Sequence, residues 1–149
     1  MLDTLIRNGT VIDGSGDSGF PADVLLKDGR IHTVAPDLEV SAAQVVDATG
    51  LCIAPGFIDA HTHDDRLMLS APDMTPKVSQ GVTTVVGGNC GVSLSPLKGV
   101  DPPEPLNLLG DRDWFRFDSV REYRQELETA GMATNCAMLV GHTLSLIHI

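Results

Sequence analysis

One stretch constrains this chain more than any other: an apolar segment that ends in two histidines one residue apart, PGFIDAHTHDD, residues 55–65. Pro55 and Gly56 break the chain before it, and the apolar residues that follow them predict a buried strand. In an extended chain, residues two apart point to the same side. His61 and His63 are therefore expected to aim both imidazoles at one point, as the ligands of a divalent metal must.

A second strand leads to a cysteine. The β-branched run at residues 82–86 favours a strand, and it is followed directly by GGNCG, residues 87–91. Cys90 thus lies just beyond the carboxyl end of a strand, as do the two histidines. In a (β/α) barrel these strand ends converge on the active site, so we expect the three side chains to meet there.

Composition narrows the classes of protein. The chain has 149 residues and a formal net charge of −10, which argues against nucleic acid and against an anionic membrane as partners. No apolar run is long enough to span a bilayer, and the N-terminus lacks the pattern of a secretion signal. Three widely spaced cysteines predict reduced thiols and a cytoplasmic protein. The oligomeric state stays open.

Residues 1–54 read as short strands separated by turns. Asn8-Gly9 and Asp28-Gly29 each lie between apolar runs, and both predict β-hairpins. Cys52 stands in an apolar strand and is expected to be a small buried residue. The segment is a small β unit that comes before the predicted barrel.

From residue 55 on, helix and strand signals alternate. Thr75-Pro76 predicts a helix start with Thr75 as the N-cap, and Ser119 with Glu122 predicts a capping box. Residues 93–112, rich in proline, are expected to be a long loop without regular structure, either functional or a mobile insertion. The aromatic residues after it, Trp114, Phe115 and Phe117, are expected to anchor it to the barrel wall, with the lining of a substrate pocket as the alternative. Residues 136–140 predict a third strand, and His142 follows at its end.

The two strings PGFIDAHTHDD and VTTVVGGNCGVSLSPL resemble the N-terminal part of the D-aminoacylase (N-acyl-D-amino-acid deacylase) family of metal-dependent amidohydrolases. The resemblance implies an α/β fold: an incomplete (β/α)8 TIM barrel of about three β/α units, residues 55–143, preceded by half of a small β-sandwich, residues 1–54. It also implies hydrolysis of the amide bond of N-acyl-D-amino acids, with Zn²⁺ as cofactor and a small N-acyl amino acid as substrate. A complete barrel takes roughly 250 residues, so this chain is too short for one.

The resemblance also assigns the site. His61 and His63 contribute to one metal position, and Cys90 belongs to the other, tighter position, with bridging as an alternative. Asp65 is a weaker candidate ligand. Asp64 and Asp65 are expected either to orient the histidines or to form a solvated loop start. His142 is expected either to touch substrate or to lie behind the metal ligands and contact them. The later histidines and the catalytic aspartate of the family have no counterpart in this chain.

Residues 144–149 do not continue the family pattern. Their six codons can match the end of a transposase adapter used in sequencing libraries, so we expect a non-native tail whose His148 is not a ligand. Two alternatives remain open. One is a cyclic amidohydrolase of the dihydropyrimidinase or hydantoinase type, and the other is a truncated, non-enzymatic product with a weak metal site.

Overall fold

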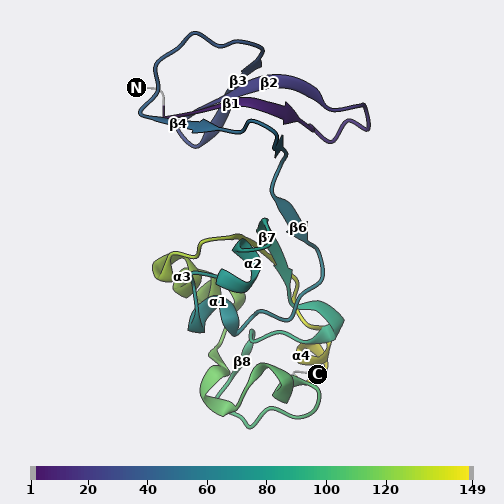
Figure 1. Ribbon diagram of the computed structural model, residues 1–149. Helices are drawn as coiled ribbons and strands as arrows, with labels where there is room; N and C mark the ends of the chain where they lie inside the picture. Colours follow the sequence, from purple (N-terminus) through teal and green to yellow (C-terminus); the bar gives the residue numbers. More distant parts are fainter. Residues whose placement is uncertain (1–2, 148–149) are drawn as a thin grey trace. The chain divides into compact units, whose positions relative to one another are not determined.

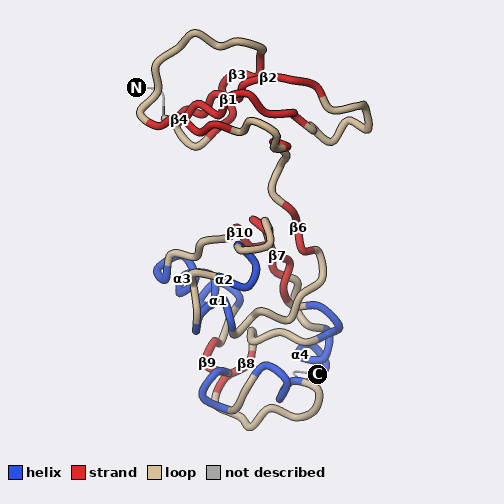
Figure 2. The backbone as a smooth tube through the Cα atoms, in the orientation of Figure 1, coloured by secondary structure: helices blue, strands red, loops and turns tan. Residues whose placement is uncertain are grey.

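A computed structural model describes residues 3–147 of the chain (Figure 1). The chain divides into two compact units, Met1–Pro55 and Gly56–Ile149. The boundary lies one residue after the predicted boundary, which falls between residues 54 and 55. Figure 2 shows that strands dominate the first unit, whereas the second contains all the helices that the described residues form.

The first unit is a five-stranded sheet. Four strands follow the order β3-β2-β1-β4, and the short strand β5 pairs with β1 farther along β1 than β4 does. Val24 packs with Val11 and Ala22 on one face of the sheet, and the paired residues Leu5 and Leu25 are buried on the other face. Cys52, predicted to be buried, is exposed instead, because the short strand β5 is covered only in part. The strands are β1 (Thr4–Val11), β2 (Phe20–Lys27), β3 (Arg30–Ala35), β4 (Gln44–Asp47) and β5 (Cys52–Ile53).

The two predicted hairpins have different outcomes. Asp28-Gly29 does join β2 to β3, and both residues have positive φ, as a tight hairpin turn requires. Asn8-Gly9 does not turn the chain: β1 runs through it, with a shift of register against β2 between Ile6 and Gly9. Asn8 has φ 63°, and its backbone N–H donates to Asp23 Oδ1 at 3.0 Å. The pair therefore forms a β-bulge in which Asn8 takes the positive φ, a conformation that some bulges share with tight hairpin turns.

The second unit is built on three parallel strands of order β10-β7-β6. Because the strands are parallel, their carboxyl ends lie at one edge of the sheet. The strands are β6 (Phe57–Asp59), β7 (Val82–Gly87), β10 (Asn135–Met138) and the short pair β8 (Leu97–Lys98) and β9 (Arg116–Phe117). The helices are α1 (Leu67–Ser70), α2 (Thr75–Val78), α3 (Val120–Ala130), α4 (His142–Ile147) and the 3-10 turns η1 (Asn89–Gly91), η2 (Leu106–Leu109) and η3 (Arg112–Trp114).

Local signals set the helix ends. Ser119 Oγ accepts the backbone N–H of Glu122 at 3.2 Å, and Gly131 ends α3 with φ 71°, as predicted. Thr75 is not an N-cap: Met74, with φ 46°, holds that position, and the Thr75 hydroxyl donates to Asp73 at 2.7 Å. The aspartate acceptor two residues earlier competes with the helix for this hydroxyl.

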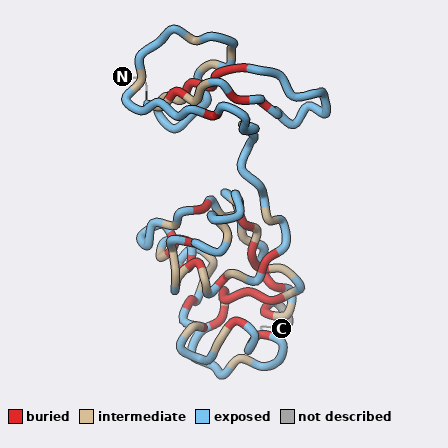
Figure 3. Tube along the Cα trace, viewed as in Figure 1, coloured by how far each residue is buried: buried red, intermediate tan, exposed pale blue. Residues whose placement is uncertain are grey.

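The expectation of an unstructured segment at residues 93–112 is wrong. Leu94, Leu97, Leu106 and Leu109 are all buried, and they belong to the core of the second unit (Figure 3). Aromatic residues 115 and 117 are buried in the same core, so the expected anchoring is confirmed. The segment lacks periodicity because several prolines interrupt it, but its leucines still supply core area.

Part of the 144–149 segment continues α4, and Leu144 is fully buried. His148 lies outside the described residues. The non-native origin of this segment stays a prediction.

Candidate metal centre

His61 and His63 follow β6 on a short segment that is fastened at both sides. The backbone N–H of His61 donates to Asp59 Oδ1 at 3.2 Å. Between the histidines, Thr62 is buried and its N–H donates to the Val86 carbonyl at 3.2 Å. With Thr62 turned inward, both imidazoles lie on the exposed side, with ring centroids 5.7 Å apart. This is the alternation that the sequence predicts for residues two apart.

Cys90 is carried by the tight turn η1 at the end of β7. It has φ 53°, and Gly88 and Gly91 on either side have φ 75° and 77°. A Cβ at Gly88 would lie 1.9 Å from the Leu139 carbonyl oxygen, so this position accepts only glycine. The Asn89 side-chain amide donates to the Val86 carbonyl at 2.6 Å. The turn is therefore a rigid support for the thiol.

These two segments bring three ligand atoms together. Cys90 Sγ lies 3.1 Å from His61 Nε2, and one ligand atom from each of His61, His63 and Cys90 lies within 4.8 Å of the others. Bonds of about 2.0–2.3 Å in a tetrahedral zinc site would separate such atoms by roughly 3.3–3.6 Å. The spacing and the donor types both fit zinc, and a thiolate disfavours Mg²⁺ and Ca²⁺.

Asp65 is not the solvated loop residue that one interpretation of the sequence allowed. It is fully buried, and its Oδ2 accepts the backbone N–H of Gly88 at 3.2 Å. Its backbone carbonyl accepts the Tyr123 hydroxyl at 2.7 Å. Among the described residues Oδ1 has no hydrogen-bond partner. Burial raises the pKa of Asp65, while the Gly88 N–H and the nearby His63 act in the opposite direction.

Asp64 contacts a lysine that the sequence did not single out. Asp64 Oδ2 accepts the Thr62 hydroxyl and lies 2.9 Å from Lys77 Nζ. Lys77, from α2, also lies 2.6 Å from Asp59 Oδ2. Burial opposes the charge of Lys77, but its bonds to Asp59 and Asp64 outweigh this and raise its pKa. The bond from Lys77, with the His61 N–H, lowers the pKa of Asp59.

His142 is exposed at the first position of α4. A Cβ at Gly91 would lie 3.8 Å from the His142 Cβ, so this histidine is close to the Cys90 turn. It does not belong to the cluster formed by His61, His63 and Cys90.

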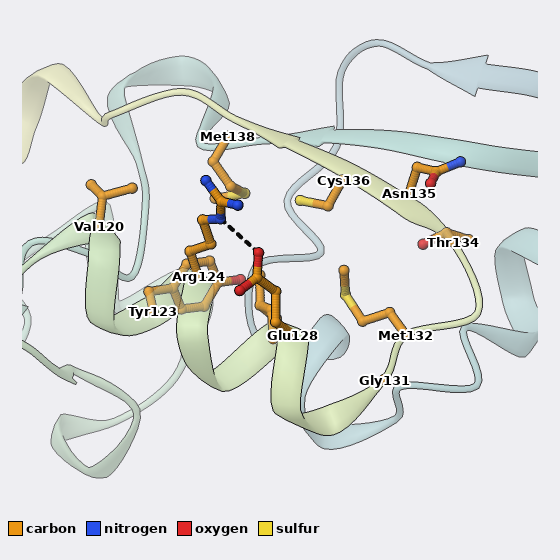
Figure 4. Close-up of a pocket in the computed structure, with 11 residues that line it drawn as sticks. Val120, Tyr123, Arg124, Glu128, Gly131, Met132, Thr134, Asn135, Cys136 and Met138 are labelled. Carbon is orange, nitrogen blue, oxygen red and sulfur yellow. Dashed lines mark hydrogen bonds and ion pairs between the residues drawn. The ribbon is translucent and has the colours of Figure 1, made fainter.

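A cavity of about 590 Å³ lies elsewhere, between α3 and β10 (Figure 4). Tyr123 and Met132 contribute to its walls, and Arg124 pairs with Glu128 at its rim, Nε to Oε1 at 2.7 Å. None of the three clustered side chains lines it. The candidate metal ligands and this cavity are therefore in different places.

The parallel strands thus bring a His-x-His segment and a cysteine turn, with three potential metal ligands, to one edge of the sheet. The amidohydrolase family model matches residues 44–145, and the chain belongs to this family. The predicted resemblance to the D-aminoacylases is also confirmed: a D-aminoacylase of Alcaligenes xylosoxydans xylosoxydans is 48% identical over 142 residues, 95% of this chain. The match spans only 29% of that relative, and it lies in the N-terminal part.

Solved structures agree. A D-aminoacylase described by its binuclear metal centre superposes with a TM-score of 0.91 at 48% identity, over 96% of this chain and 30% of that one. N-acyl-D-glutamate deacylase from Bordetella bronchiseptica, in complex with zinc and a phosphonate inhibitor, gives a TM-score of 0.88 at 42% identity, over 95% and 30%. The amidohydrolase α/β fold predicted for this chain is thereby confirmed.

No helix among residues 3–147 has the length and apolar character needed to cross a membrane.

Proposed function

We propose that this chain is the N-terminal part of a zinc-dependent amidohydrolase that cleaves the amide bond of N-acyl-D-amino acids. The observation that carries the proposal is the cluster of His61, His63 and Cys90 at the carboxyl ends of β6 and β7. Its support from the comparisons is the 48% identity to a D-aminoacylase. A small N-acyl amino acid is the expected substrate.

The residues present suit zinc. Two imidazoles and one thiolate are its common protein ligands. When bound, zinc lowers the pKa of its water to about 7 and polarises a carbonyl oxygen, which is the chemistry that amide hydrolysis needs. In this chain His61 and His63 supply the neutral donors, Cys90 supplies the charged one, and the η1 turn keeps its sulfur beside the rings.

Asp65 stabilises the two segments that carry the candidate metal ligands. Its Oδ2 fastens the Gly88 end of the cysteine turn, and it follows His63 by two residues, so it joins the two ligand segments. We assign Asp65 a positioning role, not that of a ligand. Asp64 and His142 lie beside the site, and we place His142 near substrate.

We further propose that residues 55–143 form about the first three β/α units of a (β/α)8 barrel. Residues 1–54 form one half of a β-sandwich. Exposed apolar side chains on the first sheet support this, among them Ile31 at 67% and Val45 at 58% exposure. Exposed apolar side chains on a sheet favour packing against a further layer of structure.

Zinc content tests the site directly. Wild-type protein, loaded with zinc and freed of excess metal by dialysis, should retain zinc, and Cys90→Ser should lose most of it. Cys52→Ser removes another exposed thiol in the other unit and should retain zinc like the wild type. If Cys90→Ser holds as much zinc as the wild type, the deacylase assignment fails, and a hydantoinase-type site without a cysteine ligand becomes the better interpretation.

A further inference from the structure

Lys77 joins the two ends of the histidine segment. Its Nζ lies 2.6 Å from Asp59 Oδ2, two residues before His61, and 2.9 Å from Asp64 Oδ2, one residue after His63. A third bond runs from the same Nζ to the buried Thr62, to its Oγ1 at 3.3 Å. One ammonium group on α2 thus binds before, within and after the segment that presents both imidazoles.

This ion pair differs from the other lysine pair of the unit. The side chains of Lys77, Asp59 and Asp64 are only 20%, 27% and 18% exposed. By contrast, Lys98 pairs with Asp118 at the same 2.6 Å, but their side chains are 52% and 60% exposed. Exposed pairs contribute little, whereas removal of one partner from a shielded pair leaves charge without compensation.

Asp59 connects Lys77 to His61, one of the candidate metal ligands. Its Oδ2 binds Lys77, and its Oδ1 accepts the backbone N–H of His61. Without Lys77, Asp59 and Asp64 would be two carboxylates near one another without their shared cation. They would repel and pull the two ends of the segment apart, and the imidazoles would move with it.

We propose that Lys77 is a positioning residue of the metal centre: it holds the His61–His63 segment in the geometry that binds a cation. This inference rests on the proposed function, because it requires that His61, His63 and Cys90 bind a metal. Lys77 itself touches neither metal nor substrate in this proposal.

The direction in which cation affinity changes distinguishes a positioning role of Lys77 from a purely electrostatic one. Loss of a positive charge close to a cation site, with two carboxylates released, would strengthen cation binding if charge alone mattered. Loss of a positioning group would weaken it, as for other groups that orient metal ligands, where the cost is about 10–100-fold in affinity. The two mechanisms predict opposite changes in one measured constant.

The test is Co²⁺ titration of the purified 149-residue chain, followed by the absorption of the cysteine–cobalt bond. Lys77→Met should raise the Kd by about 10-fold or more, and Lys77→Arg, which keeps the charge, should recover a large part of the loss. Lys98→Met makes the same change at the exposed pair and should leave the Kd as in the wild type. Thermal unfolding without metal checks that each variant is folded.

Each outcome decides a point. If Lys77→Met is folded and binds Co²⁺ as tightly as the wild type, or more tightly, the positioning role is overturned while the metal centre stands. If Lys77→Met does not fold, Lys77→Gln takes its place: weaker Co²⁺ binding by Lys77→Gln than by Lys77→Arg supports the role, and equal binding by the two variants contradicts it. If the wild type shows no cysteine–cobalt absorption, the metal centre and this inference both fail.

Discussion

At Gly88 the backbone leaves no room for a side chain. A Cβ there would lie 1.9 Å from the Leu139 carbonyl oxygen, and φ is 75°. Gly88→Ala must therefore displace either the cysteine turn or the chain after β10. We expect a loss of about 3 kcal/mol or more in the free energy of unfolding of this unit, measured by urea denaturation.

Gly99→Ala is the matched control for Gly88→Ala. Gly99 has nearly the same φ, 72°, but a Cβ there would meet nothing within 4 Å. Gly99→Ala should therefore lower the free energy of unfolding only by the conformational strain of a side chain at positive φ, about 1–2 kcal/mol. Equal losses in the two variants would show that the close approach of Leu139 to the turn is not present in solution.

The thiols should differ in reactivity. Burial raises the pKa of Cys136 to about 11, with the nearby Asp65 adding to the effect. Since the thiolate is the reactive form, Cys136 should be alkylated by iodoacetamide at pH 8 far more slowly than the exposed Cys52. The rate at Cys136 should keep rising as the pH approaches 11. Mass spectrometry of labelled peptides measures both, and equal rates at pH 8 would contradict the burial of Cys136.

The residues of the site were not equally predictable. His61, His63 and Cys90 can be found from the sequence because each follows a strand, and strand ends of a parallel sheet share an edge. Lys77 gave no such signal. Its partners Asp59 and Asp64 lie 18 and 13 residues earlier (77 − 59 and 77 − 64), and only the packing of α2 brings them together.

At the scale of elements, the turn η2 illustrates how a segment without periodicity can still be part of the core. Leu106 is fully buried and Leu108 is 74% exposed in the same turn. Leu106→Ala should cost about 2–5 kcal/mol in the free energy of unfolding, because it removes buried methyl groups and leaves a cavity.

Leu108→Ala makes the same chemical change at the exposed position of η2, and it should stay within about 0.5 kcal/mol of the wild type. Urea denaturation of the two variants compares them directly. Similar small effects for both would show that residues 93–112 form the unstructured loop that the sequence predicted.

Secondary structure was predictable where a local sequence signal is typical of a single structure. The run at residues 82–86 forms β7, and Ser119 with Gly131 bounds α3, since strand propensity and caps act locally. Asn8-Gly9 was misassigned because positive φ serves a bulge as well as a hairpin. The packing around Gly9 separates the two structures: a Cβ at Gly9 would lie 2.4 Å from Ile53 Cδ1, and this contact exists only in the folded sheet.

At the scale of the whole molecule, the amidohydrolase fold could be predicted because the two most specific strings mark adjacent strands of one sheet. The prolines of residues 93–112 concealed β8 and η2, because proline interrupts both helical and strand periodicity.

Catalysis should require more chain than these 149 residues. The match covers 29% of a D-aminoacylase, and the three clustered side chains are all exposed. An exposed metal site lacks the exclusion of water and the further groups that orient a substrate. With saturating zinc, the chain should show no hydrolysis of N-acetyl-D-amino acids above the buffer rate, measured by release of the free amine. Cys90→Ser, prepared identically, controls for a contaminating deacylase. Zinc-dependent turnover in the wild type that Cys90→Ser abolishes would show that a few β/α units suffice for the reaction.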